Sequence, residues 1–418
     1  MFTPAGRRAV AAGDHGVIIE LARQALGWKQ QDLADRSGYS QPTISRLERG
    51  MGRAVRDTAI LADLAGTLGL PTEAFGLVRP DAPPPTLDGV DRRDFLGSAI
   101  ALAAAALLPQ PVAEPARISA DDVTRCWVSL RRLFELDDRQ GGATVYAMAA
   151  EMARHLQNAL NRGSYVPAVG HGLGQVATAT MEHAGWLAYD AGRQDDARRW
   201  WLETCHLADM ASLPDARVTA LASMSLHATT TGRGREAASL AQAARTAAGD
   251  GASPVLLSLL AAREAVGLAQ VQDPVGASAA VAEARRWLDL GRRGDEPLWL
   301  DFWSPADLAC HETRTALALG RPQVAERAAR AALAAADHAA FPRNHTIYTV
   351  RLASVLTRVG QLDEAIDVTS RAVQNADLLR GSRRISTDLR RTVDLLGQQS
   401  YPPARTFAVA AQRLLAAA

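Results

Sequence analysis

The chain has 418 residues, of which 48% are hydrophobic, 22% are charged and 5% are aromatic. This composition is ordinary for a globular protein, and the length exceeds that of one compact core, so we expect two or more domains. The formal net charge of +1 excludes a protein that binds nucleic acid through overall basicity, so such a function must depend on a local motif. Abundant alanine and scarce β-branched runs predict an all-α fold.

Two features of the sequence favour the cytoplasm. The three cysteines, Cys126, Cys205 and Cys310, lie far apart and form no C-x-x-C motif, which is typical of a reducing compartment. The first residues include Asp14 and lack the apolar run of a signal peptide. We therefore predict a cytoplasmic protein.

Composition divides the chain into four zones. Residues 1–14 are predicted to form a mobile tail rich in Gly, Ala and Arg, and residues 15–76 a domain of short helices. Residues 77–120 contain seven prolines and are predicted to form a linker interrupted by one short apolar helix. Residues 121–418 are predicted to form amphipathic helices that are broken at regular intervals.

A helix-turn-helix pattern begins at Gln30 in the second zone. Gly38 supplies the positive φ that the turn requires, and Ser40 is predicted to cap the second helix. The inward positions of this pattern are Leu33, Ala34, Ile44 and Leu47. A later helix is predicted to close the small core through residues at helical spacing, namely Leu61, Leu64, Ala65 and Leu68.

The run from Leu26 to Gly50 resembles repressors of the Cro/Xre family, which implies a five-helix domain whose second motif helix lies in the major groove. Transferred to this sequence, the residues facing base edges are Gln41, Thr43, Ser45 and Arg46. Glutamine can pair with adenine and arginine with guanine. The resemblance also implies that Gln30 binds a phosphate and that Arg23 and Glu48 form a structural ion pair.

Arginines around the second motif helix favour phosphate contacts. Arg49, Arg53 and Arg56 follow Arg46 closely, and Glu48 is the only acidic residue among them. We predict that Arg49 and Arg53 contact the DNA backbone. The alternative is a helical hairpin without a role in DNA binding, whose arginines are simply solvated.

The linker contains Arg92 and Arg93 followed by an apolar run, which resembles a twin-arginine export signal. This pair lies far from the N-terminus, and the run is too short to span a bilayer. We predict a helix that docks the linker onto the repeats or onto a second subunit, without membrane association. Export or membrane anchoring is the alternative.

The fourth zone contains six turns with an alanine five residues after a fixed position. The pairs are Gly163/Ala168, Gly192/Ala197, Gly232/Ala237, Gln272/Ala277, Gly320/Ala325 and Gly360/Ala365. The commonest spacing is 40 residues, which predicts stacked helical hairpins. The glycine should end one helix in the left-handed conformation, and the alanine should let the next helix pack closely.

This pattern resembles the tetratricopeptide family, although its period is nearer 40 than about 34 residues. Most large consensus residues of that family are absent here, but Gly185 occupies a small-residue position of the best repeat. The resemblance implies a right-handed superhelix of helical hairpins. An irregular helical bundle is the alternative.

In such a superhelix the first helix of each hairpin lines the concave face. The residues that this places inward are Glu182, His183, Trp186, Tyr189, Arg263, His311, Arg314 and Arg351. Convergent Trp, His, Glu and Arg side chains suit a small molecule or a peptide carboxylate, so we predict an effector site formed by all of them except Tyr189. As an alternative, Trp186 and Tyr189 belong to the core and the arginines are solvated.

An insertion near residues 296–303 brings Trp299, Phe302 and Trp303 together. These aromatics could form a lid or a dimer contact, or they could pack at a helix junction. The choice stays open at this point.

Candidate chemistry is weak elsewhere. Cys205–His206 and Cys310–His311 lack further ligands at zinc spacing, so no metal site is predicted. The sequence contains no nucleophile elbow, phosphate loop or paired-carboxylate signature, so we predict neither catalytic residues nor a cofactor.

The whole architecture is similar to regulators common in actinobacteria and to the peptide-responsive regulators of Gram-positive quorum sensing. The resemblance implies a transcriptional regulator that binds a double-stranded DNA operator as a homodimer and responds to an effector. The alternative is a tetratricopeptide-type adaptor that binds a protein partner without operator binding.

Overall fold

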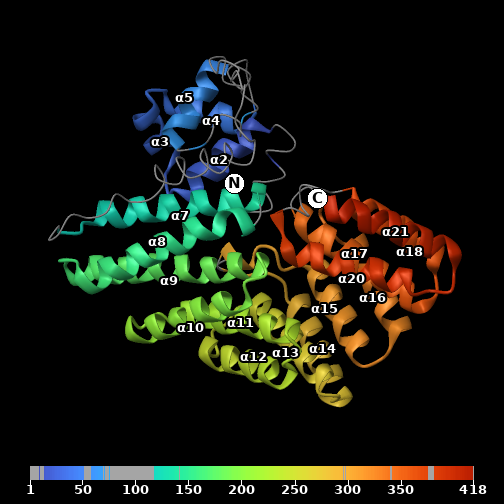
Figure 1. Cartoon of the computed structure of the whole chain (residues 1–418). Helices are drawn as coiled ribbons and strands as arrows, with labels where there is room; N and C mark the ends of the chain where they lie inside the picture. The colour runs from blue at the N-terminus through green and yellow to red at the C-terminus, as the bar shows by residue number, and fades with distance from the viewer. Residues whose placement is uncertain are drawn as a thin grey trace, which may run out of the picture. The chain divides into compact units, whose positions relative to one another are not determined.

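The computed structural model describes residues 14–50, 58–68, 117–140, 142–294, 298–338, 341–374 and 381–417, together with residues 9, 70, 75 and 296. Within these residues every regular element is a helix, which confirms the all-α prediction (Figure 1). The chain divides into two compact units. The first contains Met1–Asp91, and the second contains most of the chain from Arg92 onward.

Several predictions concern residues outside those described. They include most of the tail at 1–14, most of the linker at 77–120 with Arg92 and Arg93, and the arginines Arg53 and Arg56. Of the helices that the structure describes, none combines the length and the apolar character needed to cross a bilayer.

The described part of the first unit contains four helices of the five predicted. They are α2 (His15–Ala25), α3 (Gln30–Ser37), α4 (Gln41–Glu48) and α5 (Thr58–Leu68). Asp14 begins α2 as its N-cap, because its carboxylate accepts a hydrogen bond of 3.2 Å from the Val17 amide.

Burial in this unit confirms the predicted core. The fully or almost fully buried side chains include Ile18, Ile19, Leu33, Ala34, Ile44, Leu47, Leu61, Leu64, Ala65 and Leu68. Gly38 ends α3 with a φ of 76°, as the turn requires. Trp28 packs against this core from its edge.

The predicted capping role of Ser40 is wrong in one respect. Ser40 does occupy the N-cap position of α4, but its hydroxyl accepts no hydrogen bond from the helix backbone. The hydroxyl instead lies 2.9 Å from Thr43 Oγ1. The side chain of Thr43 therefore competes with the backbone for this hydroxyl.

The second unit is a series of helical hairpins (Figure 1). Its first helices are α7 (Ala120–Gln140), α8 (Gly142–Arg162), α9 (Pro167–Asp190), α10 (Gln194–Met210), α11 (Pro214–Thr230), α12 (Gly234–Ala248), α13 (Pro254–Gln270) and α14 (Pro274–Asp289). After a 3₁₀ turn (Leu298–Leu300) follow α15 (Pro305–Ala318), α16 (Pro322–Ala334), α17 (Pro342–Val359), α18 (Leu362–Val373), α20 (Arg383–Gly397) and α21 (Pro402–Ala417). Neighbouring helices pack together, and α9, α11, α13 and α15 also contact one another in turn, which is typical of stacked hairpins.

Five of the six predicted repeat turns are confirmed. Their first residues all have positive φ: Gly192 (78°), Gly232 (74°), Gln272 (60°), Gly320 (68°) and Gly360 (82°). The paired alanines, Ala197, Ala237, Ala277, Ala325 and Ala365, are fully buried. The left-handed residue therefore reverses the chain, and the alanine admits the next helix at close range.

The sixth predicted turn, Gly163/Ala168, is wrong. Gly163 is not among the residues of positive φ, and Ala168 is exposed. A Cβ on Gly163 would lie 2.4 Å from Cδ1 of Ile118, so glycine is needed here for close packing and not for a left-handed turn. Conversely, the turn between α10 and α11 contains Ser212 with a φ of 54°. A prediction based on glycine positions does not find this turn.

Gly185 confirms its predicted role as a small residue between helices. A Cβ at this position of α9 would lie 2.5 Å from the indole Nε1 of Trp201 on α10. Trp201 is fully buried and its indole nitrogen donates to the Glu182 carbonyl at 3.3 Å. The missing side chain thus makes room for the buried indole ring of Trp201.

Trp303, one of the three aromatic residues of the insertion, packs at a helix junction. This side chain is 2% exposed, and its indole nitrogen donates to Ser258 Oγ at 3.1 Å. Trp303 also lies edge-on to His311, with the ring centroids 5.1 Å apart. Of the interpretations left open by the sequence, core packing therefore holds for Trp303.

The first and last parts of the second unit contact each other. Helix α20 packs against α9, and Ser382 donates to the fully buried carboxylate of Asp190 at 2.7 Å. Arg384 donates to the same carboxylate oxygen at 3.2 Å. These contacts join residues about 190 positions apart in sequence.

Candidate DNA-binding surface and effector site

Helix α4 is held against α2 by an unusually close backbone contact. A Cβ on Gly16, near the start of α2, would lie 2.7 Å from the Glu48 carbonyl and 2.8 Å from the Leu47 carbonyl. The inner side of α4 is apolar, since Ile44 and Leu47 are fully buried. Apart from the buried Glu48, its polar side chains are exposed or half-buried.

A buried ion pair anchors the end of α4. Arg23 Nε donates to Glu48 Oε1 at 2.5 Å, and Arg23 Nη2 donates to Glu48 Oε2 at 3.1 Å. A third N–H of Arg23 donates to the Trp28 carbonyl at 2.6 Å. The hydrogen bond with Glu48 raises the pKa of Arg23. This arrangement confirms the ion pair implied by the resemblance to Cro/Xre repressors.

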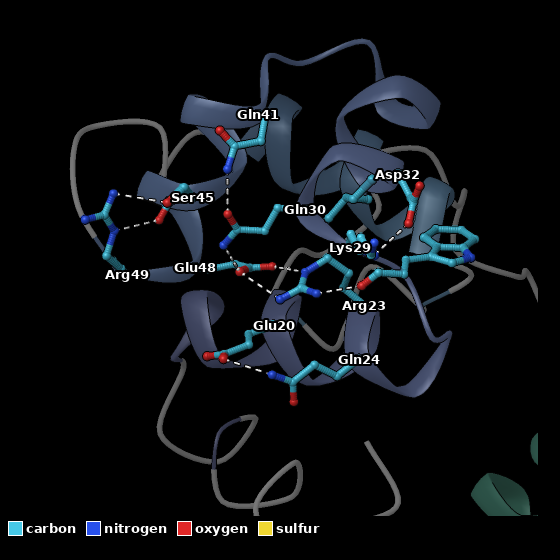
Figure 2. Close-up of polar contacts among 12 residues, drawn as sticks. Glu20, Arg23, Gln24, Lys29, Gln30, Asp32, Gln41, Ser45, Glu48 and Arg49 are labelled. Carbon is cyan, nitrogen blue, oxygen red and sulfur yellow. Dashed lines mark hydrogen bonds and ion pairs between the residues drawn. The ribbon is translucent and has the colours of Figure 1, made fainter.

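The same carboxylate begins a chain of hydrogen bonds that leads to the start of α4 (Figure 2). Gln30 Nε2 donates to Glu48 Oε2 at 2.7 Å, and Gln41 Nε2 donates to Gln30 Oε1 at 2.7 Å. Gln30 and Gln41 therefore have fixed amide orientations before any ligand binds. The second N–H and the carbonyl oxygen of Gln41 lie outside this chain, and an adenine edge needs one donor and one acceptor.

The other predicted DNA contacts lie on or beside α4. Arg46 is exposed, and Thr43 and Ser45 are half-buried. The exposed Arg49 donates to the carbonyl of Ser45 at 3.0 Å and to its hydroxyl at 3.1 Å (Figure 2). Arg53 lies outside the described residues.

The predicted effector residues separate into two groups. The first group comes together: Glu182 of α9, Arg263 of α13, His311 and Arg314 of α15, and Arg351 of α17. Electrostatic interactions connect Arg263 with Glu182 and Arg314, and connect His311 with all three arginines. The first helices of successive hairpins thus bring their charged residues to one place.

His183 and Trp186 belong to a different environment. The ring of His183 lies 4.0 Å from that of Phe134 on α7, and burial lowers the His183 pKa to about 4. Trp186 lies beneath Arg384 of α20, whose guanidinium carbon is 5.3 Å from the ring centroid. These two side chains connect α9 to α7 and α20.

Sequence reasoning missed several residues of the inner face. Thr229 on α11 accepts a hydrogen bond of 2.5 Å from Arg314, and Ser223 on α11 donates to Glu182 at 2.8 Å. Cys310 accepts a hydrogen bond of 2.8 Å from Arg351. Small polar residues of this kind follow no sequence pattern of their own. Each of them does lie one hairpin away from an inward-facing arginine, and that position could have been used to predict them.

The carboxyl of Glu182 is expected to produce a measurable pH dependence of stability. Burial raises its pKa from 4.5 to about 7, while Ser223 and Arg263 oppose the shift. The folded state thus retains a proton that the unfolded state loses above pH 4.5, so this stabilising contribution is complete below pH 4.5 and is lost as the pH rises through about 7. The variant Glu182→Gln should show no such loss and should be more stable than wild type above pH 7.

Urea denaturation at a series of pH values measures this effect as the difference between the two proteins. Two buried histidines, His183 and His227, have pKa values lowered to about 4 by burial, and they destabilise both proteins on acidification. Their contribution cancels in the difference curve. Parallel curves for wild type and Glu182→Gln would show that this carboxyl ionises normally.

Comparison with known proteins identifies the N-terminal unit. Residues 19–75 match the family model Helix-turn-helix. No curated protein matches the chain. Among solved structures, the crystal structure of yeast Tom70 is similar at 12% identity, covering 95% of this chain and 89% of that chain with a TM-score of 0.30. Residues 19–75 of the N-terminal unit are thus similar to helix-turn-helix domains, and the second unit consists of helical hairpins.

Proposed function

We propose that this protein is a sequence-specific transcriptional regulator that acts in the cytoplasm and places α4 in the major groove of a DNA operator. The observation that carries the proposal is the chain of hydrogen bonds from Arg23 through Glu48 and Gln30 to Gln41. It fixes a side chain suited to reading adenine at the first turn of α4. Such preorganisation lowers the entropic cost of binding a base edge.

The remaining side chains have complementary roles in this proposal. Thr43, Ser45 and Arg46 face base edges, and Arg46 binds guanine through two parallel hydrogen bonds. Gln30 lies at the N-terminus of α3, where the helix dipole favours a phosphate. Arg49 and Arg53 bind neighbouring phosphates, and Arg49 can leave Ser45 because its side chain is exposed.

The repeat unit is proposed to bind an effector on its inner face and to pair two copies of the chain. Two copies would read half-sites separated by about one helical turn of DNA, roughly 34–36 Å. Analytical ultracentrifugation of the full chain at micromolar concentration should then show a dimer. Sedimentation as a monomer at that concentration would remove the dimer from the proposal.

The contact of Arg46 with DNA can be tested by substitution. Arg46→Ala should weaken binding to the preferred duplex by ~1–3 kcal/mol and relax the preference at one base pair, because a bidentate contact to guanine is lost. Arg46→Lys should retain the attraction to phosphates but should still lose most of this base preference, because lysine cannot form the planar pair. Fluorescence anisotropy with duplexes that differ at single positions measures both effects.

Arg36→Ala is a matched control, because it removes the same charge from the exposed side of α3. Arg36 packs over Trp28, 4.5 Å from the ring centroid, and does not belong to α4. This variant should keep the base preference. If Arg46→Ala bound every duplex as wild type does, α4 could not be the helix that reads the groove. An adaptor function would predict no salt-dependent DNA affinity for any of these proteins.

A further inference from the structure

The inner face of the repeats contains a buried arginine whose charge is poorly satisfied. Arg263 is 4% exposed, and its Nε and Nη1 have no hydrogen-bond partner among the residues that the structure describes. Burial lowers the pKa of Arg263 to about 10, so the guanidinium remains charged at neutral pH. A buried charge with unused donors is costly, so its presence needs an explanation, and a bound anion would supply one.

Two more arginines lie beside Arg263. Arg314 and Arg351 are half-buried on α15 and α17, the first helices of the next two hairpins. Arg263 interacts electrostatically with Arg314, and Arg314 interacts with Arg351. Tyr189 on α9 interacts electrostatically with all three arginines, so these side chains share one region of the inner face.

The hydrogen-bond partners of these arginines do not balance their charge. Arg314 donates to the hydroxyl of Thr229 at 2.5 Å, and Arg351 donates to the sulfur of Cys310 at 2.8 Å. Burial raises the pKa of the Cys310 thiol, which therefore stays neutral. Each guanidinium carries five N–H donors, so both have further donors available for a ligand.

The acidic groups nearby compensate little of this positive charge. Glu182 faces Arg263, but it also accepts from Ser223 and gains a proton near neutral pH. Asp388 of α20 interacts with Arg314 and Arg351, but its side chain is 42% exposed and lies 3.6 Å from Arg391. His311 is neutral because burial, and then Arg314, lower its pKa. The cluster therefore has an excess of cationic groups.

We propose that Arg263, Arg314 and Arg351 bind the oxyanion group, carboxylate or phosphate, of a small-molecule effector. Guanidinium groups match the planar geometry of carboxylate and the oxygens of phosphate, and partial burial strengthens both interactions. The three arginines come from three consecutive hairpins, so a bound anion would draw α13, α15 and α17 together. The proposal names the ligand chemistry of the effector site and rests on the proposed function for that site.

The test uses the full chain and simple anions as probes. Phosphate, pyrophosphate, succinate and citrate are each compared with chloride at constant ionic strength, and the midpoint of thermal unfolding is recorded. At least one probe should raise the midpoint by several degrees in wild type. Stronger stabilisation by pyrophosphate would indicate a phosphorylated effector, and stronger stabilisation by the carboxylates an organic acid or a peptide terminus.

Two variants separate a binding role from a structural one. Arg263→Met should abolish the response to the anion while leaving the ligand-free midpoint unchanged or higher, because a buried, unsatisfied charge is removed. Arg285→Met is the matched control, because the Arg285 side chain is 60% exposed and pairs with Glu312 at 2.6 Å. This control should respond to anions as wild type does.

The result that overturns the proposal is the absence of stabilisation by any probe at millimolar concentration, or an equal response in Arg263→Met. A large loss of ligand-free stability in Arg263→Met would also overturn it, because the arginine would then be a structural ion-pair partner of Glu182. DNA binding is measured separately with the same preparations. Operator binding without an anion response would refute this proposal alone, and an anion response without operator binding would refute only the proposed regulator.

Discussion

Replacing Glu48 with alanine should destabilise the helix-turn-helix unit by about 3–5 kcal/mol, because it leaves the buried charge of Arg23 without its partner. Both side chains are largely buried, with side-chain exposures of 11% for Arg23 and 4% for Glu48. The substitution also removes the acceptor of Gln30, and with it the hydrogen-bond chain that orients Gln41. Whole domains are stable by only about 5–15 kcal/mol, so the unit should open measurably.

Hydrogen exchange of the full chain, followed by mass spectrometry, can localise this effect. Peptides from α3 and α4 should lose protection in Glu48→Ala, while peptides from α9 to α14 should not change. The double variant Arg23→Met with Glu48→Met should recover much of the protection, because two apolar side chains leave no unpaired charge. Unchanged protection of α4 in Glu48→Ala would show that the ion pair contributes little to this unit.

Replacing Asp190 with alanine should have a comparable effect on the repeat unit. Asp190 is fully buried, and its carboxylate accepts hydrogen bonds from Ser382 at 2.7 Å and from Arg384 at 3.2 Å. Arg343 of α17 lies 3.8 Å from its other oxygen. Removing the carboxylate leaves the buried hydroxyl of Ser382 and the guanidinium of Arg384 without their anionic partner. We therefore expect the free energy of unfolding to fall by about 3–5 kcal/mol.

The loss should appear first where the two ends of the repeat array meet. Exchange should accelerate in α20 and at the end of α9, and less in α11 to α14, which lie between these two helices in the chain. Asp363→Ala is a suitable control, because it removes an exposed acceptor 2.7 Å from the Tyr401 hydroxyl and should cost less than about 1 kcal/mol. Equal protection of α20 from hydrogen exchange in wild type and Asp190→Ala would mean that apolar packing alone holds α20 against α9.

The helix-turn-helix unit could be predicted closely because its determinants are local. Gly38 and the apolar residues Leu33 and Ile44 lie within one short segment, where helical spacing alone decides which side chains are buried. The role of Ser40 was predicted less well, because its hydroxyl contacts the side chain of Thr43 and not the helix backbone. Competition of this kind depends on rotamers that no pattern records.

The repeat turns show both the strength and the limit of a glycine pattern. Five of the predicted turns contain a left-handed residue. One of these residues is Gln272, whose turn could be predicted only from the alanine that follows it. Gly163 does not have this conformation, because a glycine can serve close packing as well as positive φ. Ser212 was missed for the opposite reason, since it has a positive φ of 54° without being a glycine.

Long-range contacts were beyond prediction from this sequence. The network around Asp190 joins α9 to residues about 190 positions later, and nothing in the local sequence of either segment indicates the other. The inward arginines lie at two positions of their hairpins: Arg263 and Arg351 nine residues before the turn residue, and Arg314 six residues before it. His183 and Trp186 occupy the same two positions before Gly192 but contact α7 and α20, which the repeat pattern alone does not include.

The central claim, that α4 reads bases in a duplex, is tested most directly by selection from random DNA. The full chain is incubated with random duplexes at several salt concentrations, and the bound DNA is sequenced. We predict enrichment of one motif, with half-sites about 10 base pairs apart, and loss of its guanine preference in Arg46→Ala. Equal recovery of all sequences by wild type at every salt concentration would contradict the claim.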